Sequence, residues 1–363
     1  MDSPQFTINN GILANVGLIE AAKEVIENAP LIPIYEARFI KEAIARTVHH
    51  ATHLEVEAYD LSLAEVKRAI EGENLVARER DIQEVINYRN AIRYIEELGK
   101  EKKEEGLRYT QTMLKKINYF ACERIITDGR AGNYRQTQVI LRNSGTGEVV
   151  FRPPPAIELT FLIEDFFTWI NTAEARKIHP VIRAGIAHYY LVAVHPFIEA
   201  NGRTARAFAT LILFAEGYDI KKFFSLEEYF DRDALHYYQA LMMVDKQHRN
   251  LANRDLTPWL EYFTQAMAVE LTRIKERVKR LSLDLKVKGR IGYQIPLNER
   301  QIKLMEYLEE HGSISTTEGR KVASEYSEDT ILRDFNYFVQ KKLVKKSGRT
   351  KGARYVLKGH PGR

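Results

Sequence analysis

The segment of residues 195–206, HPFIEANGRTAR, places a base, a carboxylate, an amide and two guanidiniums around a glycine. Apolar residues at helical spacing fill residues 181–194 before it and residues 207–215 after it, which predicts a buried helix on each side. We therefore expect the polar cluster to be a loop held between two core helices, where side-chain geometry is easiest to maintain. These residue types are the components of a site that moves a nucleotide.

The second half of this segment suits phosphate binding. Gly202 lets the backbone turn at close range, and the helix that follows would offer free N–H groups and a positive dipole end to an anion. Arg203 and Arg206 are three residues apart on that helix, so both can reach one polyphosphate. Asn201 can orient the loop or donate to a phosphate oxygen.

The first half suits proton transfer and metal binding. His195 titrates near neutral pH and can take a proton from an attacking hydroxyl. Glu199 is a hard oxygen donor of the kind that Mg²⁺ uses when it bridges phosphate oxygens. Phosphoryl and nucleotidyl transfers are promoted mainly by positioning and charge stabilisation, so a set this small is sufficient for such chemistry.

The order of these residues resembles the signature of the Fic family, HxFx(D/E)(G/A)N(G/K)RxxR, and every specified position is met. Residues 132–155 look like the family's flap hairpin, and residues 237–241 and 255–259 resemble two of its later helices. The resemblance extends over residues 30–275. It implies transfer of AMP from ATP to a Ser, Thr or Tyr hydroxyl of a target protein, with pyrophosphate as the leaving group.

The resemblance also assigns roles to individual residues. It makes His195 the base, Phe197 a core anchor for the loop and Glu199 the Mg²⁺ ligand. It places the following residues in contact with the nucleotide: Asn201, Gly202, Arg203, Arg206, Tyr237 and Tyr238. The branch of the family that phosphorylates its targets has Lys where this chain has Gly202, so the glycine favours nucleotidyl transfer.

The flap residues Val139, Ile140 and Leu141 would hold the target segment by adding it as an extended strand. In that mode of recognition the affinity comes from main-chain hydrogen bonds, with little readout of the target's sequence. The sequence therefore does not name the target.

A second resemblance points to self-inhibition. In many Fic proteins a helix with the pattern (S/T)xxxE(G/N) sets its glutamate against the second arginine of the signature and blocks productive ATP binding. Here residues 51–56, ATHLEV, supply Glu55 but depart from the pattern at Ala51 and Val56, and Glu57 is the nearest alternative. The other interpretation is a solvated carboxylate on an amphipathic helix.

The composition fits a cytoplasmic protein. The chain has 363 residues, of which 45% are hydrophobic and 28% charged, and it begins without a signal-peptide pattern. No apolar run approaches the ~20 residues that span a bilayer, so we expect no membrane contact. Cys122 is the single cysteine and is predicted to be a small core residue. His49 and His53 have the spacing of metal ligands, but no third ligand follows, so we expect no metal there.

The chain is expected to be mostly α, with four segments. Residues 1–105 form an N-terminal helical region that holds the candidate inhibitory helix, and residues 106–278 form the Fic catalytic core with its β-hairpin flap. Residues 279–295 form a linker, and residues 296–363 form a further domain. Within the core we expect His188 to be a buried structural histidine, and we expect the following aromatic residues to be core packing: Phe161, Phe166, Phe167 and Trp169.

The last segment is predicted to be a winged helix. Residues 298–311, 316–326 and 327–342 have helical patterns, and residues 343–357 have the pattern of a hairpin. Residues 296–363 contain 14 Lys plus Arg against 9 Asp plus Glu, whereas the other residues balance at 40 against 40. A basic wing can contact DNA, but Glu328 and Asp329 open the third helix, and winged helices also dock proteins or dimerise, which leaves a homodimer open.

Taken together, the sequence predicts a protein adenylyltransferase that is restrained by Glu55. Three alternatives remain open. The Fic core could sense a nucleotide for a DNA-binding regulator, the donor could be UTP or CDP-choline, or Glu55 could align a water that removes AMP from a modified target.

Overall fold

The computed structural model describes residues 4–29, 31, 33–55, 61–100, 106–126, 129–142, 145–220, 223–287, 297–348 and 353–357. The chain divides into two compact units, which are described separately below. The first unit comprises Met1–Glu27 and Glu42–Lys275, and the second comprises Asn28–Lys41 and Glu276–Arg363. No helix among the described residues has the length and apolar character needed to cross a bilayer.

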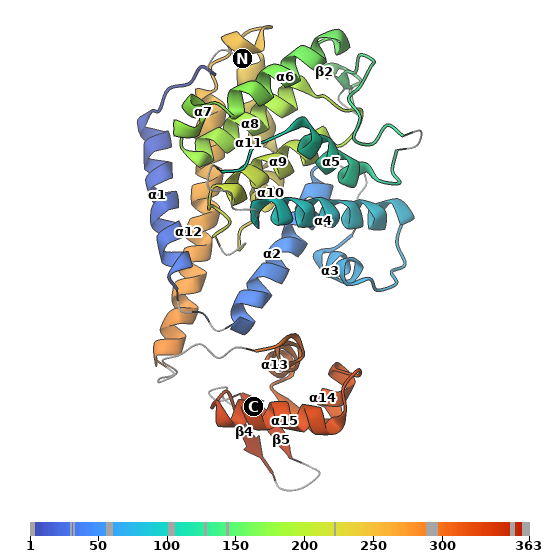
Figure 1. The fold of residues 1–363 in the computed structure, drawn as a ribbon, viewed down its shortest axis with the longest axis vertical. Coiled ribbons are helices and arrows are strands. Elements are labelled where there is room, and N and C mark those ends of the chain that lie inside the picture. The colour runs from blue at the N-terminus through green and yellow to red at the C-terminus, as the bar shows by residue number, and fades with distance from the viewer. Residues whose placement is uncertain are drawn as a thin grey trace. The chain divides into compact units, whose positions relative to one another are not determined.

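The described part of the first unit is built from helices and one small sheet (Figure 1). The helices are α1 (Asn10–Glu27), α2 (Pro33–His53), α3 (Leu63–Glu71), α4 (Glu79–Lys100), α5 (Gln111–Cys122), α6 (Leu159–Ile170), α7 (Ala173–Lys177), α8 (Pro180–Val194), α9 (Asn201–Ala215), α10 (Leu226–Arg232), α11 (Ala234–Asp245) and α12 (Thr257–Val287). The first residues of α2 and the last residues of α12 belong to the second unit. Single 3-10 turns lie at Ala156–Glu158 and Leu251–Asn253.

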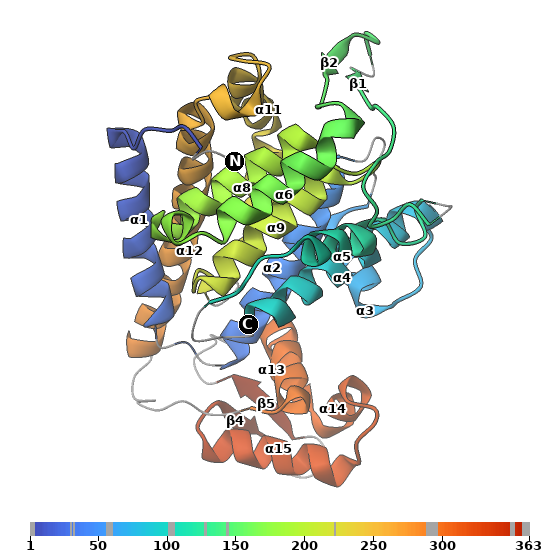
Figure 2. The same cartoon turned by 45° about the horizontal axis from the view of Figure 1, so that its top comes forward.

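Helices α8 and α9 form the centre of the first unit, and α4 and α5 pack against α9 (Figures 1 and 2). The start of α8 is set by Pro180 at its first position and by His179, whose Nδ1 accepts a hydrogen bond from the Val181 N–H. Nearly every side chain of α8 is buried. The two buried helices predicted on either side of the motif are both present, and α9 already begins at Asn201.

Helix α12 packs closely against α8 because α8 has a glycine at the crossing. A Cβ on Gly185 would lie 2.9 Å from Leu260 Cδ2 and 3.0 Å from Phe263 Cδ1, and the Trp259 indole N–H donates to the Gly185 carbonyl at 2.7 Å. His188 stacks on Trp259 with 4.8 Å between ring centres, and burial holds its pKa well below the usual value. His188 is therefore a neutral core histidine, as predicted.

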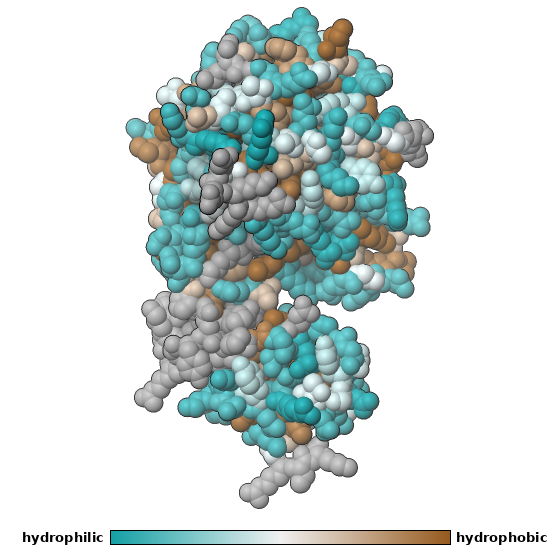
Figure 3. Space-filling view, viewed as in Figure 1, coloured by the Kyte–Doolittle hydropathy of each residue, from teal (hydrophilic) through white to brown (hydrophobic). Residues whose placement is uncertain are grey.

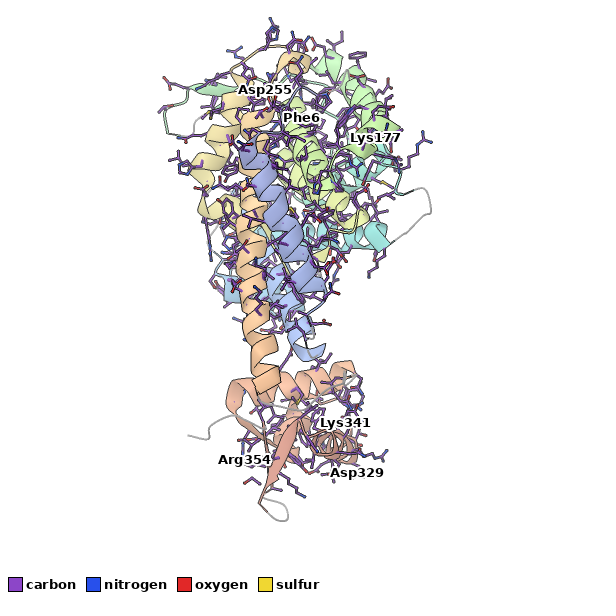
Figure 4. The ribbon with its side chains drawn as sticks, turned by 90° about the vertical axis from the view of Figure 1, so that its left-hand side faces the viewer. Phe6, Lys177, Asp255, Asp329, Lys341 and Arg354 are labelled. Carbon is purple, nitrogen blue, oxygen red and sulfur yellow. The ribbon has the colours of Figure 1, made fainter. Side chains whose placement is uncertain are left out.

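The N-terminal segment and α1 contact α12 and the residues just before it. Gln5 pairs with Asp255, the Asn15 amide donates to the Thr264 hydroxyl at 3.2 Å, and α1 lies alongside α12 (Figures 1 and 4). Figure 4 labels Phe6 and Asp255 at the end where these two segments meet.

The prediction for the aromatic residues of α6 was right for three and wrong for one. Phe166, Phe167 and Trp169 are buried, whereas 70% of Phe161 is exposed. The buried face of α6 is centred on Leu159 and Ile163. Because successive residues of a helix are turned by about 100°, a side chain two positions from both of these points away from that face.

The flap is a short antiparallel hairpin of β1 (Leu141–Arg142) and β2 (Val149–Phe151). Leu141 pairs with Phe151, and Val139 and Ile140 precede the strand. The Gln138 side-chain amide donates to the carbonyls of Val139 and Pro153, each at 3.0 Å, so these oxygens are occupied before the ladder begins. The predicted hairpin is present, and of the three flap residues named from the sequence only Leu141 lies within a strand.

The second unit contains a three-stranded antiparallel sheet with the strand order β3-β5-β4. Its elements are α13 (Glu299–His311), β3 (Ser313–Ser315), α14 (Thr316–Val322), α15 (Glu328–Gln340), β4 (Val344–Ser347) and β5 (Arg354–Leu357). The three predicted helices and the hairpin are found, and β3 was not predicted. Residues 349–352 of the predicted hairpin lie outside the described residues.

The core of the second unit is apolar, and its visible surface is mostly hydrophilic (Figure 3). The core side chains include Leu304, Leu308, Ile314, Ile331, Phe335, Phe338 and Tyr355. Phe335 stacks on Tyr355 with 4.3 Å between ring centres. Capping boxes at Asn298 and Ser315 begin α13 and α14, and Gly312 in the left-handed conformation ends α13.

We expect Phe335→Ala to destabilise the second unit, because it removes a fully buried ring from the centre of this core. A truncation of this kind costs about 3–5 kcal/mol. Hydrogen exchange of the full-length chain, measured by mass spectrometry, should show lost protection in residues 297–348 and 353–357. Leu332→Ala, on the same helix but 38% exposed, is the matched control and should leave exchange unchanged. Equal loss of protection in both variants would contradict the assignment of Phe335 to the core.

Candidate functional site

The loop between α8 and α9 is held in shape by its own residues. His195 and Ala200, at its two ends, adopt left-handed backbone conformations with φ of 51° and 56°. Between them, the Phe197 N–H donates to Asn201 Oδ1 at 2.8 Å, and Asn201 Nδ2 donates to the Phe197 carbonyl at 2.9 Å. Of the two roles that the sequence left open for Asn201, orienting the loop is the one that these contacts serve. Phe197 is buried against Tyr134, as expected of an anchor.

Asn118 on α5 holds the second half of the loop from outside. Its Nδ2 donates to the Glu199 carbonyl at 2.9 Å and to the Thr204 hydroxyl at 3.1 Å, and its Oδ1 accepts from the Gly132 N–H at 3.0 Å. Asn118 is fully buried. Asn118 was not predicted from the sequence, because a single asparagine in a helix carries no pattern that would reveal its partner.

Arg135 ties the loop to the flap. Its backbone N–H donates to the Pro196 carbonyl at 2.9 Å, and its guanidinium donates to the carbonyls of His195 at 2.8 Å and Pro154 at 2.6 Å. Burial lowers the pKa of Arg135. Arg135 belongs to the segment that resembles the flap, so the sequence marked its position without revealing its role.

His195 is half-buried at the C-terminal end of α8. Its Nδ1 faces the Val192 carbonyl at 3.3 Å, which favours a proton on Nδ1 and leaves Nε2 as an acceptor. The ring centre lies 6.3 Å from that of Phe151 on the flap. Burial lowers the pKa of His195 to about 4, although the nearby Val192 carbonyl and Glu55 carboxylate act in the opposite direction. The imidazole is therefore unprotonated at neutral pH.

The two arginines of α9 are buried and face the same carboxylate. Arg206 forms an ion pair with Glu55, with 2.8 Å between NH2 and Oε1, and the Arg203 Nε lies 3.5 Å from Glu55 Oε2. A Cβ on Gly202 would collide with Glu55 Oε1. The carboxylate of Glu55 thus lies over the first turn of α9, at the place where a glycine and a helix N-terminus make an anion site.

Glu55 lies in the turn that follows α2. Its N–H donates to the Thr52 carbonyl at 3.2 Å, and Arg206 NH2 also donates to the Ala51 carbonyl at 3.3 Å. Ala51 occupies the position where the inhibitory pattern has Ser or Thr, and here its backbone makes the contact with Arg206. Val56 and Glu57 lie outside the described residues.

The end of α2 is attached to α10 by two histidines. His50 Nδ1 and His53 Nδ1 lie 2.7 Å and 2.8 Å from the two carboxylate oxygens of Asp231. These hydrogen bonds hold the pKa of Asp231 below its usual value, against the effect of burial. Burial and the two neighbouring imidazoles lower the pKa of His49 to about 4.

More acidic groups lie behind the arginines. Glu84 on α4 forms an ion pair with Arg203, and Glu227 on α10 accepts from the Tyr88 hydroxyl at 2.9 Å. Burial alone would lower the pKa of Arg206, but the negative charge of Glu55 and other acidic groups nearby raises it well above its usual value. Neither Glu84 nor Glu227 was identified from the sequence, because isolated acidic residues on helices give no pattern.

The two tyrosines of α11 differ in their surroundings. Tyr237 is buried with its hydroxyl 3.3 Å from His188 Nε2, and burial raises its pKa to about 12. Tyr238 is 45% exposed, and its hydroxyl donates to the Leu54 carbonyl at 3.2 Å, next to Glu55.

The remaining predicted residues differ in their exposure to solvent. Glu199 is exposed, with its backbone carbonyl held by Asn118. Ile140 and Leu141 of the flap are 38% and 37% exposed. Cys122 is buried beneath the loop as predicted, and burial raises its pKa to about 12, so it is a neutral thiol.

Residues 108–213, which include α5, the flap, the loop and the arginine pair, match the Fic/DOC family. Protein adenylyltransferase Fic of Drosophila grimshawi is 29% identical over 182 residues, which cover 49% of this chain and 34% of the relative. The protein of the same name from Nematostella vectensis is 26% identical over 214 residues, which cover 55% of this chain and 44% of the relative. The chain therefore spans less than half the length of these curated relatives.

Solved structures share the fold. A Fic family protein from Desulfovibrio desulfuricans aligns with a TM-score of 0.64 and 21% identity, over 99% of this chain and all of that one. Fic-1 of C. elegans aligns with a TM-score of 0.57 and 22% identity, over 74% of each chain. The chain thus has a mostly helical fold that it shares with solved Fic structures, and the part that carries the loop between α8 and α9 is similar to the Fic/DOC family and, distantly, to protein adenylyltransferase Fic.

Proposed function

We propose that this chain is a protein adenylyltransferase that transfers AMP from ATP to a hydroxyl side chain of a target protein, and that Glu55 restrains it. The observation that carries the proposal is the carboxylate of Glu55, which lies over Gly202 and pairs with Arg206. A carboxylate in that position means that the first turn of α9 and its arginines accept an anion. The relatives' name, protein adenylyltransferase, supports the same reaction.

The proposed reaction needs one proton acceptor. The target hydroxyl gives its proton to Nε2 of His195, and its oxygen attacks the α-phosphorus of ATP as the bond to the β-phosphate breaks and pyrophosphate leaves. The lowered pKa of His195 supports this role, because the imidazole is already unprotonated at neutral pH. Arg203, Arg206 and the N–H groups at the start of α9 would hold the phosphates as charge shifts onto pyrophosphate.

Glu199 fits a Mg²⁺ ligand, since it is an exposed carboxylate three residues before Gly202 whose main chain is fixed by Asn118. When bound, Mg²⁺ would neutralise charge on the phosphate oxygens. Gly202 leaves the space over the first turn of α9 free for the triphosphate, which a lysine side chain there would crowd. Tyr238 lies beside the turn that carries Glu55, a position that suits a contact with the nucleotide.

We propose that the flap holds the target. Ile140 and Leu141 are partly exposed. Among the described residues β1 pairs only with β2, which supports addition of a target strand along the other edge of β1. The occupant would be a segment carrying a Ser, Thr or Tyr hydroxyl near its centre.

We propose that the second unit is a winged helix that docks a protein or a second copy of the chain. Its order of helix, strand, two helices and hairpin supports the fold. Asp329 lies at the start of α15, where a reader of the DNA major groove would present polar or basic groups (Figure 4). DNA contact through exposed Lys345 and Lys346 of β4 is the alternative, and salt-sensitive binding of a duplex would favour it.

We expect His195→Ala to abolish AMP transfer while ATP still binds, because the base acts on the hydroxyl and the phosphates are held by other groups. Loss of a general base typically costs 10²- to 10⁴-fold. Labelled ATP, UTP and CDP-choline are each incubated with the protein and a cell extract, and the mass of the adduct identifies the donor. Unchanged transfer in the variant would remove His195 from this role.

The pH profile of the unchanged chain provides a second measurement of the same role. Because only the neutral imidazole accepts a proton, transfer should be lost as the pH falls through the pKa of His195, which burial places at about 4. An ordinary histidine would lose activity near 6.5. An acid limb of kcat/KM at or above that value would contradict a buried base.

We expect Glu199→Ala to weaken ATP binding in the presence of Mg²⁺ and to leave the weaker binding in EDTA unchanged, because the variant removes only the metal ligand. Calorimetric titration with ATP under both conditions measures the difference. Glu199→Asp is the matched control and should retain part of the Mg²⁺ effect. If Mg²⁺ strengthens binding equally in all three chains, Glu199 is not the ligand.

We expect Glu55→Gly to raise AMP transfer, including automodification, by about tenfold or more. Removing one partner of a buried ion pair changes the balance by a few kcal/mol, and each 1.36 kcal/mol is tenfold in rate. Glu57→Gly in the same assay separates the two candidates. Activation by Glu57→Gly alone would move the inhibitory role two residues along the chain, and activation by neither would leave this helix with a purely structural role.

A further inference from the structure

Each of the two buried arginines pairs most closely with a different carboxylate, and the two carboxylates are held differently. Glu55 lies in a turn, its side chain is 19% exposed, and it pairs most closely with Arg206. Glu84 has no exposed surface, lies within the 22-residue helix α4, and pairs with Arg203 through NH1. Because α4 packs directly against α9, Glu84 and Arg203 are fixed by the same helix contact.

The two edges of the Arg203 guanidinium face different partners. NH1 is bound by Glu84, while Nε lies 3.5 Å from Glu55 Oε2, outside hydrogen-bond geometry. Within the described residues the Nε of Arg203 is a buried donor without a hydrogen-bond partner. An anion that displaced Glu55 would therefore meet an N–H group of Arg203 that is already in place and uncommitted.

The carboxylate of Glu84 also keeps Arg203 paired with a negative charge. A buried carboxylate is tolerated only when it is paired, and Arg203 is its close partner, with the exposed Arg80 one turn away at 3.7 Å from the other oxygen. If Glu55 leaves to admit ATP, Arg203 keeps a negative partner. Without Glu84, the guanidinium would be free to turn fully toward Glu55 or toward the wrong phosphate oxygen.

We propose that Glu84 is a positioning residue that holds Arg203 by NH1 throughout the reaction, so that its Nε can bind a phosphate oxygen when Glu55 is displaced. Glu55 is then the exchangeable carboxylate of the site and Glu84 the permanent one. This inference rests on the proposed adenylyl transfer.

The test uses the full-length Glu55→Gly chain, in which the exchangeable carboxylate is absent. In that background Glu84→Ala should lower kcat by between about 10-fold and 100-fold, as misplacement of a binding group does, with a smaller change in ATP affinity because Arg206 and the α9 amides remain. Glu84→Gln retains an oxygen toward NH1 and should restore part of the loss. Glu270→Gln, a buried carboxylate paired with Arg273 on α12, is the matched control and should leave kcat unchanged.

A double-mutant cycle separates positioning from general damage to the fold. If Glu84 acts through Arg203, adding Glu84→Ala to Arg203→Ala should cause no further loss of kcat. A full additional loss, or equal kcat for Glu84→Ala and its parent, would overturn the inference. Glu84→Gln serves the same comparison if Glu84→Ala fails to fold. Absence of transfer in the Glu55→Gly parent would instead reject the proposed function itself.

Discussion

Two guanidiniums buried three residues apart on one helix need negative partners, and the first unit is arranged to supply them. Arg203 and Arg206 are each 3% exposed, so water cannot stabilise their charge. Carboxylates come from the turn after α2, from α4 and from the start of α10, three places far apart in the sequence. The elements that pack around α9 thus meet the requirement that buried charges be paired.

The same requirement bears on the proposed restraint by Glu55. Replacing a carboxylate by a phosphate would keep the arginines neutralised, so the proposed exchange of Glu55 for a nucleotide would involve no stage at which both guanidiniums lack a negative partner. The helix N-terminus under Gly202 contributes the rest of the attraction and has no side chain to move. In the proposed function, restraint and nucleotide binding would therefore use one set of charges.

The residues of the loop could be predicted from the sequence because they are contiguous. His195, Gly202 and Arg206 lie in one short segment between two apolar helices, and the position of that segment follows from periodicity alone. Their partners could not be predicted, since Glu84 and Asn118 are single polar residues on helices that meet the loop only in three dimensions. A hydrogen bond between distant elements leaves no periodic signal in the chain.

Within the described residues, the Arg135 guanidinium binds the flap to the loop through main-chain oxygens alone, those of Val194, His195, Thr137 and Pro154. A carbonyl is present whatever the side chain, so the residues at both ends of the flap can change identity without weakening this attachment. If the hairpin holds the target as proposed, selection can alter which proteins it recognises while the distance from the hairpin to the imidazole stays constant. In such an arrangement the choice of partner and the chemistry can evolve separately.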